Sequence, residues 1–276
     1  LAVGSTIGIG SSALTALTSG GYNLAIGHQA GLLVTDGSSN TLIGYGVADG
    51  MRSNSSRNTA LGAGAFGGTH ATADSDDCVA IGAYAMNQAC NAVTGSVAVG
   101  SYALNELTTG TGNLAIGYQA LQDNQTGGDN VMIGYQAGKD ANDAGFDKNV
   151  GIGNYVFDGV ASSQNVIQCT AVGHGALSGV LTSAGDNNTA VGAYSLAAVT
   201  SGASNIAMGT SSGASITTGS FNTCIGWQAG DDLDTMTHNT CVGADALAGS
   251  SLVDLCVIVG SQAATGALTA AADATV

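Results

Sequence analysis

Aliphatic residues recur directly before a glycine at near-regular intervals along the chain. Two residues before that glycine the chain mostly carries Ala, and four residues before it Asn is the commonest residue. The fifteen motif glycines are Gly10, Gly27, Gly44, Gly62, Gly82, Gly100, Gly117, Gly134, Gly153, Gly173, Gly192, Gly209, Gly226, Gly243 and Gly260, and successive ones are 17 to 20 residues apart. A fixed period of this kind is the signature of a repeat architecture.

The length of the period selects the kind of repeat. Repeats built from two helices need more than about 30 residues, whereas 17 to 20 residues suit one coil of a β-solenoid. We therefore expect an all-β chain, a parallel β-solenoid (β-roll) of about fifteen coils that forms a single domain over residues 1–276. Each coil is predicted to hold two short strands of about five residues, joined by glycine-rich corners with positive φ. The longer coils should carry surface loops at 70–77, 139–148 and 158–164.

The two faces of each predicted strand differ in composition. Residues one and three before the glycine point to one side and carry mainly Ile, Val, Leu, Met and Thr. Residues two and four before it point to the other side and carry Ala, Cys and Asn. The small set suits a narrow interior, so the aliphatic set is predicted to be covered by another copy of the chain. A closed ring is expected, and the faces alone do not decide between two and three copies.

Ten asparagines occupy the slot four residues before the motif glycine. Asparagine amides that stack from coil to coil can bond to one another and to the backbone at a corner. We therefore predict a structural ladder. Its members are Asn23, Asn40, Asn58, Asn113, Asn130, Asn149, Asn188, Asn205, Asn222 and Asn239.

Composition and charge narrow the possible functions. The chain has 44 Gly and no Pro, and its 4 Lys and Arg against 19 Asp and Glu give a formal net charge of −15. Because four basic residues are too few to form a positively charged surface for phosphate groups, nucleic acid is not expected as a partner. No apolar run approaches the 18 residues that a membrane helix needs, so membrane insertion is not expected either. The sequence opens at Leu1 rather than Met, and we expect it to be a fragment of a longer fibre.

Six cysteines raise the question of disulfides or metal. Cys224 and Cys241 share the slot two residues before the glycine, so they should stack in adjacent coils. The six form no CxxC pair, and histidines do not stand at ligand spacing from them. We expect buried free thiols, with a Cys224–Cys241 bridge as the alternative. The cysteines are Cys78, Cys90, Cys169, Cys224, Cys241 and Cys256.

Acidic residues form three local clusters, at positions 74/76/77, 140/143/147 and 231/232/234. Their oxygen ligands would suit Ca²⁺, but the stretch from Asp140 lacks the fifth-position ligand and the closing Glu of a calcium loop. Solvated loop charge is the preferred interpretation. A carboxylate pair for polysaccharide cleavage would need a cleft with aromatic rings, which a slim coil hardly offers. We expect no catalytic residues, no cofactor and no resident metal.

Aromatic residues gather directly after the motif glycine. Outward rings could stack on a glycan of a host cell surface, and the candidates for such contact are Tyr45, Tyr118, Tyr135 and Trp227. The competing interpretation, which we prefer, is that the rings cover small-residue corners and pack between subunits.

The repeat resembles that of two protein classes. The stretches Asn113-Leu-Ala-Ile-Gly-Tyr-Gln-Ala-Leu121 and Asn188-Thr-Ala-Val-Gly-Ala-Tyr-Ser-Leu196 look like the repeats of phage tail-fibre proteins and the β-roll heads of trimeric autotransporter adhesins. The resemblance implies a left-handed homotrimer on a virion surface or outside the cell, with a host glycan or protein as a possible partner. The adhesin repeat is shorter, near 14 residues, so the 17-residue coil favours a structural segment of a tail fibre.

Three alternatives to a tail fibre stay open. The first is an adhesin head that binds surface or matrix ligands itself. The two less favoured ones are a polysaccharide-degrading tailspike, for which a slim coil offers little cleft, and an ice-binding solenoid, which needs a flat threonine array. Here the slot three residues before the glycine alternates Thr with Leu, Val and Ile.

Overall fold

The structure, a computed structural model, describes residues 4–51, 54–68, 74–142, 145–160, 164–249 and 254–265. The chain divides into two compact units, residues 1–139 and 140–276. Of the predicted surface loops, residues 70–73, 143–144 and 161–163 lie outside the described residues.

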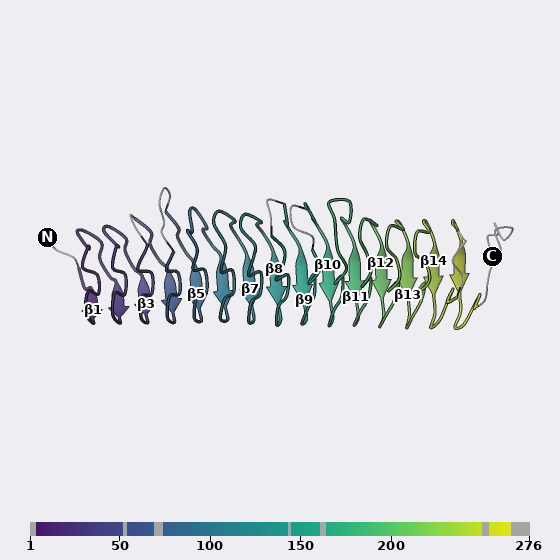
Figure 1. Ribbon diagram of the computed structural model, residues 1–276, viewed down its shortest axis with the longest axis horizontal. Coiled ribbons are helices and arrows are strands. Elements are labelled where there is room, and N and C mark those ends of the chain that lie inside the picture. Colours follow the sequence, from purple (N-terminus) through teal and green to yellow (C-terminus); the bar gives the residue numbers. More distant parts are fainter. Residues whose placement is uncertain are drawn as a thin grey trace. The chain divides into compact units, whose positions relative to one another are not determined.

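Each unit is a stack of three-residue parallel strands that follow one another in chain order (Figure 1). The first unit contains β1 (Ile7–Ile9), β2 (Leu24–Ile26), β3 (Thr41–Ile43), β4 (Thr59–Leu61), β5 (Val79–Ile81), β6 (Val97–Val99), β7 (Leu114–Ile116) and β8 (Val131–Ile133). The second contains β9 (Val150–Ile152), β10 (Thr170–Val172), β11 (Thr189–Val191), β12 (Ile206–Met208), β13 (Thr223–Ile225), β14 (Thr240–Val242) and β15 (Val257–Val259). Every strand ends on the residue before a motif glycine. The predicted all-β parallel solenoid is confirmed.

Strands pair in register, so equivalent positions of the repeat lie side by side. Ala25 of β2 lies opposite Leu42 of β3, and in the second unit Cys224 of β13 lies opposite Cys241 of β14. This register makes every slot of the repeat a column that runs from coil to coil. A residue's place relative to the motif glycine therefore fixes its neighbours above and below.

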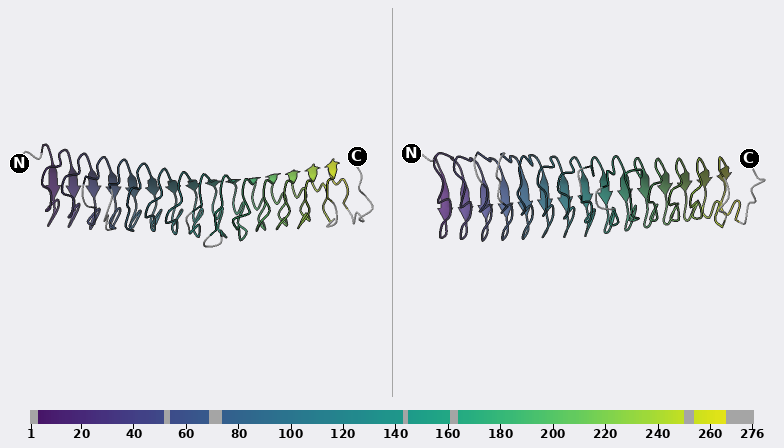
Figure 2. Two further views of the ribbon diagram at one scale, coloured as in Figure 1. Left: turned by 90° about the horizontal axis from the view of Figure 1, so that it is seen from above. Right: turned by 45° about the horizontal axis from the view of Figure 1, so that its top comes forward.

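The prediction of two strands in each coil is wrong, because the described part of each coil contains one strand. The return path is irregular instead (Figure 2). It holds residues in the left-handed region two and four positions after the motif glycine, such as Gln119 (φ 57°) and Leu121 (φ 50°). A β-strand cannot contain this conformation. The return path still bonds coil to coil, since Leu121 N–H donates to Ala137 O over 2.9 Å.

The interior of the coil is narrow and apolar. The middle residue of most strands is small and fully buried, as at Ala98 and Ala115. Leucines from the return path fill the remaining space, and Leu104, Leu107 and Leu121 are all completely buried. Small strand residues thus face larger turn residues, which gives a thin but closely packed core.

The motif glycine cannot be replaced without strain. Gly117 has φ +138°, which side-chain-bearing residues rarely adopt, and a Cβ at this position would lie 2.1 Å from the backbone O of Gly134 in the next coil. The repeat keeps glycine here because two adjacent backbones approach each other this closely.

Candidate functional site

The outward side of the strands forms an apolar surface in each unit. We define the outer sheet face as the residues one and three positions before each motif glycine. The middle strand residue is buried in most strands, while its two neighbours are half-buried or exposed, as in β7 and β12. The exposed fractions are 41 % at Ile152 and 44 % at Met208, and they are higher in the first and last strands, with 57 % at Ile9 and 69 % at Val259. The predicted division into a small inner set and an aliphatic outer set is therefore what the strands show.

Aromatic rings border the outer sheet face on one side. We define the aromatic corner as the two residues that follow each motif glycine, at the arrowhead end of the strands in Figure 1. In the first unit Tyr84 stacks on Tyr102 with ring centroids 5.4 Å apart, and Tyr118 stacks on Tyr135 at the same distance. An edge contact of 6.3 Å between Tyr102 and Tyr118 joins the two pairs. Four successive coils thus share one column of rings.

The four candidate glycan-contact residues do not form a single cluster. Tyr45 stacks on His28 at 5.3 Å, Tyr118 and Tyr135 stack on each other, and Trp227 belongs to the second unit. All four side chains are exposed. A sugar stacks on the flat face of a ring, and the faces that these stacked rings share are already occupied.

The opposite border of the outer sheet face was not singled out by sequence reasoning. We define the leading corner as the residue five positions before each motif glycine, just ahead of the asparagine slot. Most of its residues have left-handed φ, and most are exposed, including Tyr22 and Phe221 at 71 % and 56 %. Its signal in the sequence is weak because unrelated residue types share the slot. In the first unit they are Ser5, Tyr22, Ser39, Arg57, Asp77, Gly95, Gly112 and Asp129, and in the second Lys148, Gln168, Asn187, Ser204, Phe221, His238 and Leu255.

The ten asparagines of the predicted ladder are all buried, with at most 1 % exposure. In the first unit Asn130 donates to Asn113 Oδ1 from both its backbone N–H and its Nδ2, each over 3.1 Å. Asn113 Nδ2 in turn donates to Gly127 O over 2.8 Å. The same bonds join Asn205 to Asn188 in the second unit. One oxygen thus accepts two hydrogen bonds from the coil above.

Cysteines occupy the interior and are free. Cys224 and Cys241 lie opposite each other and are fully buried. The hydrogen bond to Cys241, followed by burial, raises the pKa of the Cys224 thiol well above its ordinary value. Burial raises the pKa of Cys78 to about 11. A thiol that resists ionisation is a poor nucleophile and a poor metal ligand.

Acidic clusters are engaged in bonds between coils. Asp76 Oδ1 accepts the Ser56 N–H over 2.7 Å, and Arg57 pairs with both Asp76 and Asp77. That pairing holds the pKa of Asp77 below its usual range. Asp143 of the second cluster lies outside the described residues. Within the part of the chain that the structure describes, three or more His, Cys, Asp or Glu side chains do not converge as a metal site would require.

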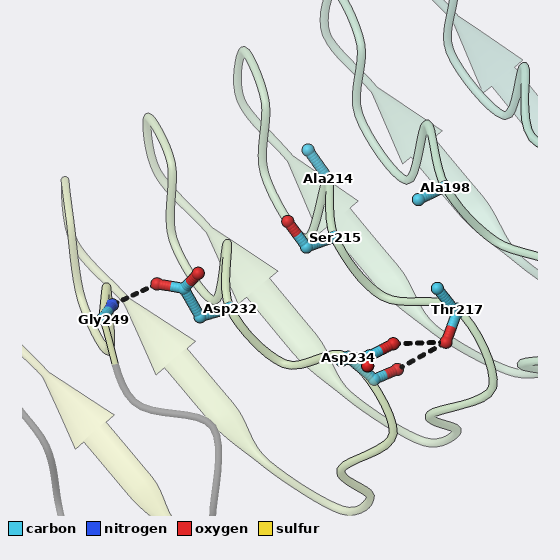
Figure 3. Close-up of a pocket in the computed structure, with 7 residues that line it drawn as sticks. All are labelled: Ala198, Ala214, Ser215, Thr217, Asp232, Asp234 and Gly249. Atoms are coloured by element: carbon cyan, nitrogen blue, oxygen red, sulfur yellow. Dashed lines mark hydrogen bonds between the residues drawn. The ribbon is translucent and has the colours of Figure 1, made fainter.

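One pocket of ≈ 550 Å³ lies in the second unit (Figure 3). Small and acidic residues line it: Ala198, Ala214, Ser215, Thr217, Asp232, Asp234 and Gly249. Asp232 accepts the Gly249 N–H, and Asp234 accepts the hydroxyl of Thr217. Both carboxylates therefore tie neighbouring coils together, and the pocket offers a saccharide no aromatic side chain among these seven residues.

Comparison with known proteins does not assign this chain to a family. The described residues include no helix with the length and apolar character that a membrane crossing demands. The sequence matches no known protein family and no curated protein.

Proposed function

We propose that this chain is a structural segment of an extracellular or virion-borne fibre, of the tail-fibre kind, and that it self-associates as a homotrimer. The observation that carries the proposal is the outer sheet face. Every coil adds aliphatic side chains to it, while the polar groups of the asparagine slot are bonded inside the coil. A soluble protein rarely leaves a contiguous apolar surface of this length in water.

The interior suits a mechanical role rather than a chemical one. Backbone, asparagine and carboxylate bonds run from each coil to the next, and the cysteines are buried and hard to ionise. A repeat of this kind gains stability from every added coil. The number of subunits is taken from the resemblance of the repeat, because any closed ring would cover the outer sheet face.

Sedimentation equilibrium tests the proposal directly. We expect a species of about 80 kDa, three times the 26.7 kDa chain. Replacing Ile116→Asp on the outer sheet face should shift the equilibrium towards monomer, because the trimer would bury the new charge. Thr126→Asp, at an exposed position of the return path in the same coil, is the matched control and should leave the trimer intact. A wild-type monomer at micromolar concentration would overturn the proposal.

A further inference from the structure

In four coils the two borders of the outer sheet face carry side chains that complement each other. In the coil of β13, Phe221 occupies the leading corner and Trp227 the aromatic corner, with exposed fractions of 56 % and 52 %. In the coil of β2, Tyr22 and His28 occupy the same two positions and are both exposed. Each of these coils thus presents an aromatic ring at both borders.

Charged residues at the borders follow the same rule in two other coils of the second unit. In the coil of β14, the exposed His238 lies at the leading corner, where one face of its ring stacks on Phe221 of the preceding coil at 4.9 Å, and Asp245 lies at the aromatic corner. In the coil of β9, the exposed Lys148 and the ring of Tyr155 hold these positions. A histidine with a carboxylate and an ammonium with a phenol ring are both attractive pairs.

These partners cannot meet within one chain. Phe221 and Trp227 are six residues apart, and the extended strand β13 runs between them. At about 3.3 Å for each extended residue, their Cα atoms lie roughly 15–20 Å apart. The complementarity is therefore available only to a second molecule.

We propose that the leading corner of one copy packs against the aromatic corner of the next copy, at the same coil height, in a parallel ring of identical chains. The inference rests on the proposed self-association and names its contacts. A second copy is the partner that fits, because it repeats the same column spacing and the same order of corner residues. Rotation about a closed-ring axis joins unlike borders, whereas a two-fold contact between antiparallel copies would join like borders.

Cysteine cross-linking tests this pairing. The variant Phe221→Cys/Trp227→Cys is treated with diamide, which takes up two electrons and two protons as each thiol pair becomes a disulfide. We expect a covalent trimer of about 80 kDa on a non-reducing denaturing gel, from a chain of 26.7 kDa. Tyr22→Cys/His28→Cys should give the same product through the first unit. The wild-type chain, with its buried native thiols, is the control for background oxidation.

Three further variants test which corners are in contact and whether the contacting residues belong to equivalent coils. Phe221→Cys alone and Trp227→Cys alone should stay uncross-linked, because neither position meets its own copy. Phe221→Cys/Tyr194→Cys, offset by two coils, should cross-link at least tenfold more slowly than the matched pair. Cross-linking of a single-cysteine variant, or equal rates for matched and offset pairs, would overturn the proposed pairing.

The outcomes separate this inference from the proposed function. A matched variant that sediments as a trimer but gives no cross-link overturns the pairing and leaves the fibre proposal standing. A chain that sediments as a monomer overturns both. Trp227 is the sole tryptophan, so its emission gives a readout that needs no cysteine. The emission should shift to shorter wavelength on assembly, and Phe221→Ala should reduce that shift in a sample that remains trimeric; an unchanged shift would overturn the pairing.

Discussion

At the scale of single residues, the asparagine slot places a polar side chain in the buried interior of the coil. Each side chain supplies one acceptor to the coil above and one donor to a backbone carbonyl. Both roles need an amide, because a carboxylate has no N–H and leucine has neither group. The sequence contained enough to predict this ladder, since an asparagine repeated at coil spacing in an apolar context has few other uses.

Replacement of Asn113→Asp should destabilise the first unit. The carboxylate would lose the donor to Gly127 O and would place negative charge in a buried position. We expect a loss of roughly 2 kcal/mol or more in unfolding free energy, measured by chemical denaturation. Asn113→Ala serves as a reference for simple loss of the bonds. Equal stability of the aspartate variant and the wild type would contradict an internal ladder.

Asn124 departs from this pattern of bonded interior amides, as does the buried Oε1 of Gln122. Asn124 is fully buried, yet neither atom of its amide has a hydrogen-bond partner within the described residues. The same slot, seven residues after the motif glycine, holds Leu107, Val199 and Ile216 in other coils. Asn124→Leu should therefore raise the unfolding free energy by about 1–3 kcal/mol, because the amide loses its hydrogen bonds to water on folding and gains none in return, whereas leucine has no polar group to desolvate. A lower thermal midpoint for this variant would show that the amide is stabilised in the folded chain.

Asp231 gives a prediction with a definite dependence on pH. Burial, followed by the charges of Asp232 and Asp245, raises its pKa above the ordinary value of 3.8. An acid whose folded pKa is raised destabilises the fold when ionised, and that cost disappears as pH falls through the raised pKa. Asp231→Asn should thus be more stable than wild type at pH 7, and the difference should shrink on acidification. Thermal melts at pH 7 and pH 4 measure it, and a difference that grows at pH 4 would contradict the assignment.

At the scale of the coil, the motif glycine sets how closely two coils approach. Gly117→Ala would force a Cβ to within 2.1 Å of the Gly134 carbonyl in an unfavourable backbone region. We expect a loss of about 3 kcal/mol or more in unfolding free energy. Gly95→Ala, where an added Cβ meets nothing within 4 Å, is the matched control and should cost much less. Similar losses for the two variants would mean that close approach is not what requires glycine.

The strand half of the coil was predictable from the sequence, whereas the return path was not. The period, the alternation of faces and the asparagine slot all come from residues whose chemistry is repeated. The return path instead depends on left-handed φ at residues such as Tyr84, Leu104 and Phe157. These residue types ordinarily avoid that region, so propensity favours the wrong conformation. Hydrogen bonds to the neighbouring coil offset the strain, and such bonds are invisible in a single repeat.

The leading corner was missed for a related reason. Sequence reasoning looks for repeated residue types, and this slot varies from Arg57 to Gly112 to Phe221. In the proposed assembly, what matters at this slot is the residue that each member would meet on the neighbouring copy, and a search for repeated residue types does not detect that. The aromatic corner was found because tyrosine recurs there.

At the scale of the whole molecule, the order of the strands decides how the chain would respond to force. Hydrogen bonds between coils run along the stacking direction within each unit, so a pull in that direction loads the coils one after another rather than together. A released coil of 17 residues extends by roughly 55 Å, from about 3.5 Å per residue less one strand spacing of 4.8 Å. Single-molecule stretching of one chain should therefore show a sawtooth with steps of that size or small multiples of it. One cooperative rupture of a whole unit would contradict this. A fibre of such chains would yield gradually under tension, because each coil that unfolds would lengthen the chain before the next one unfolds.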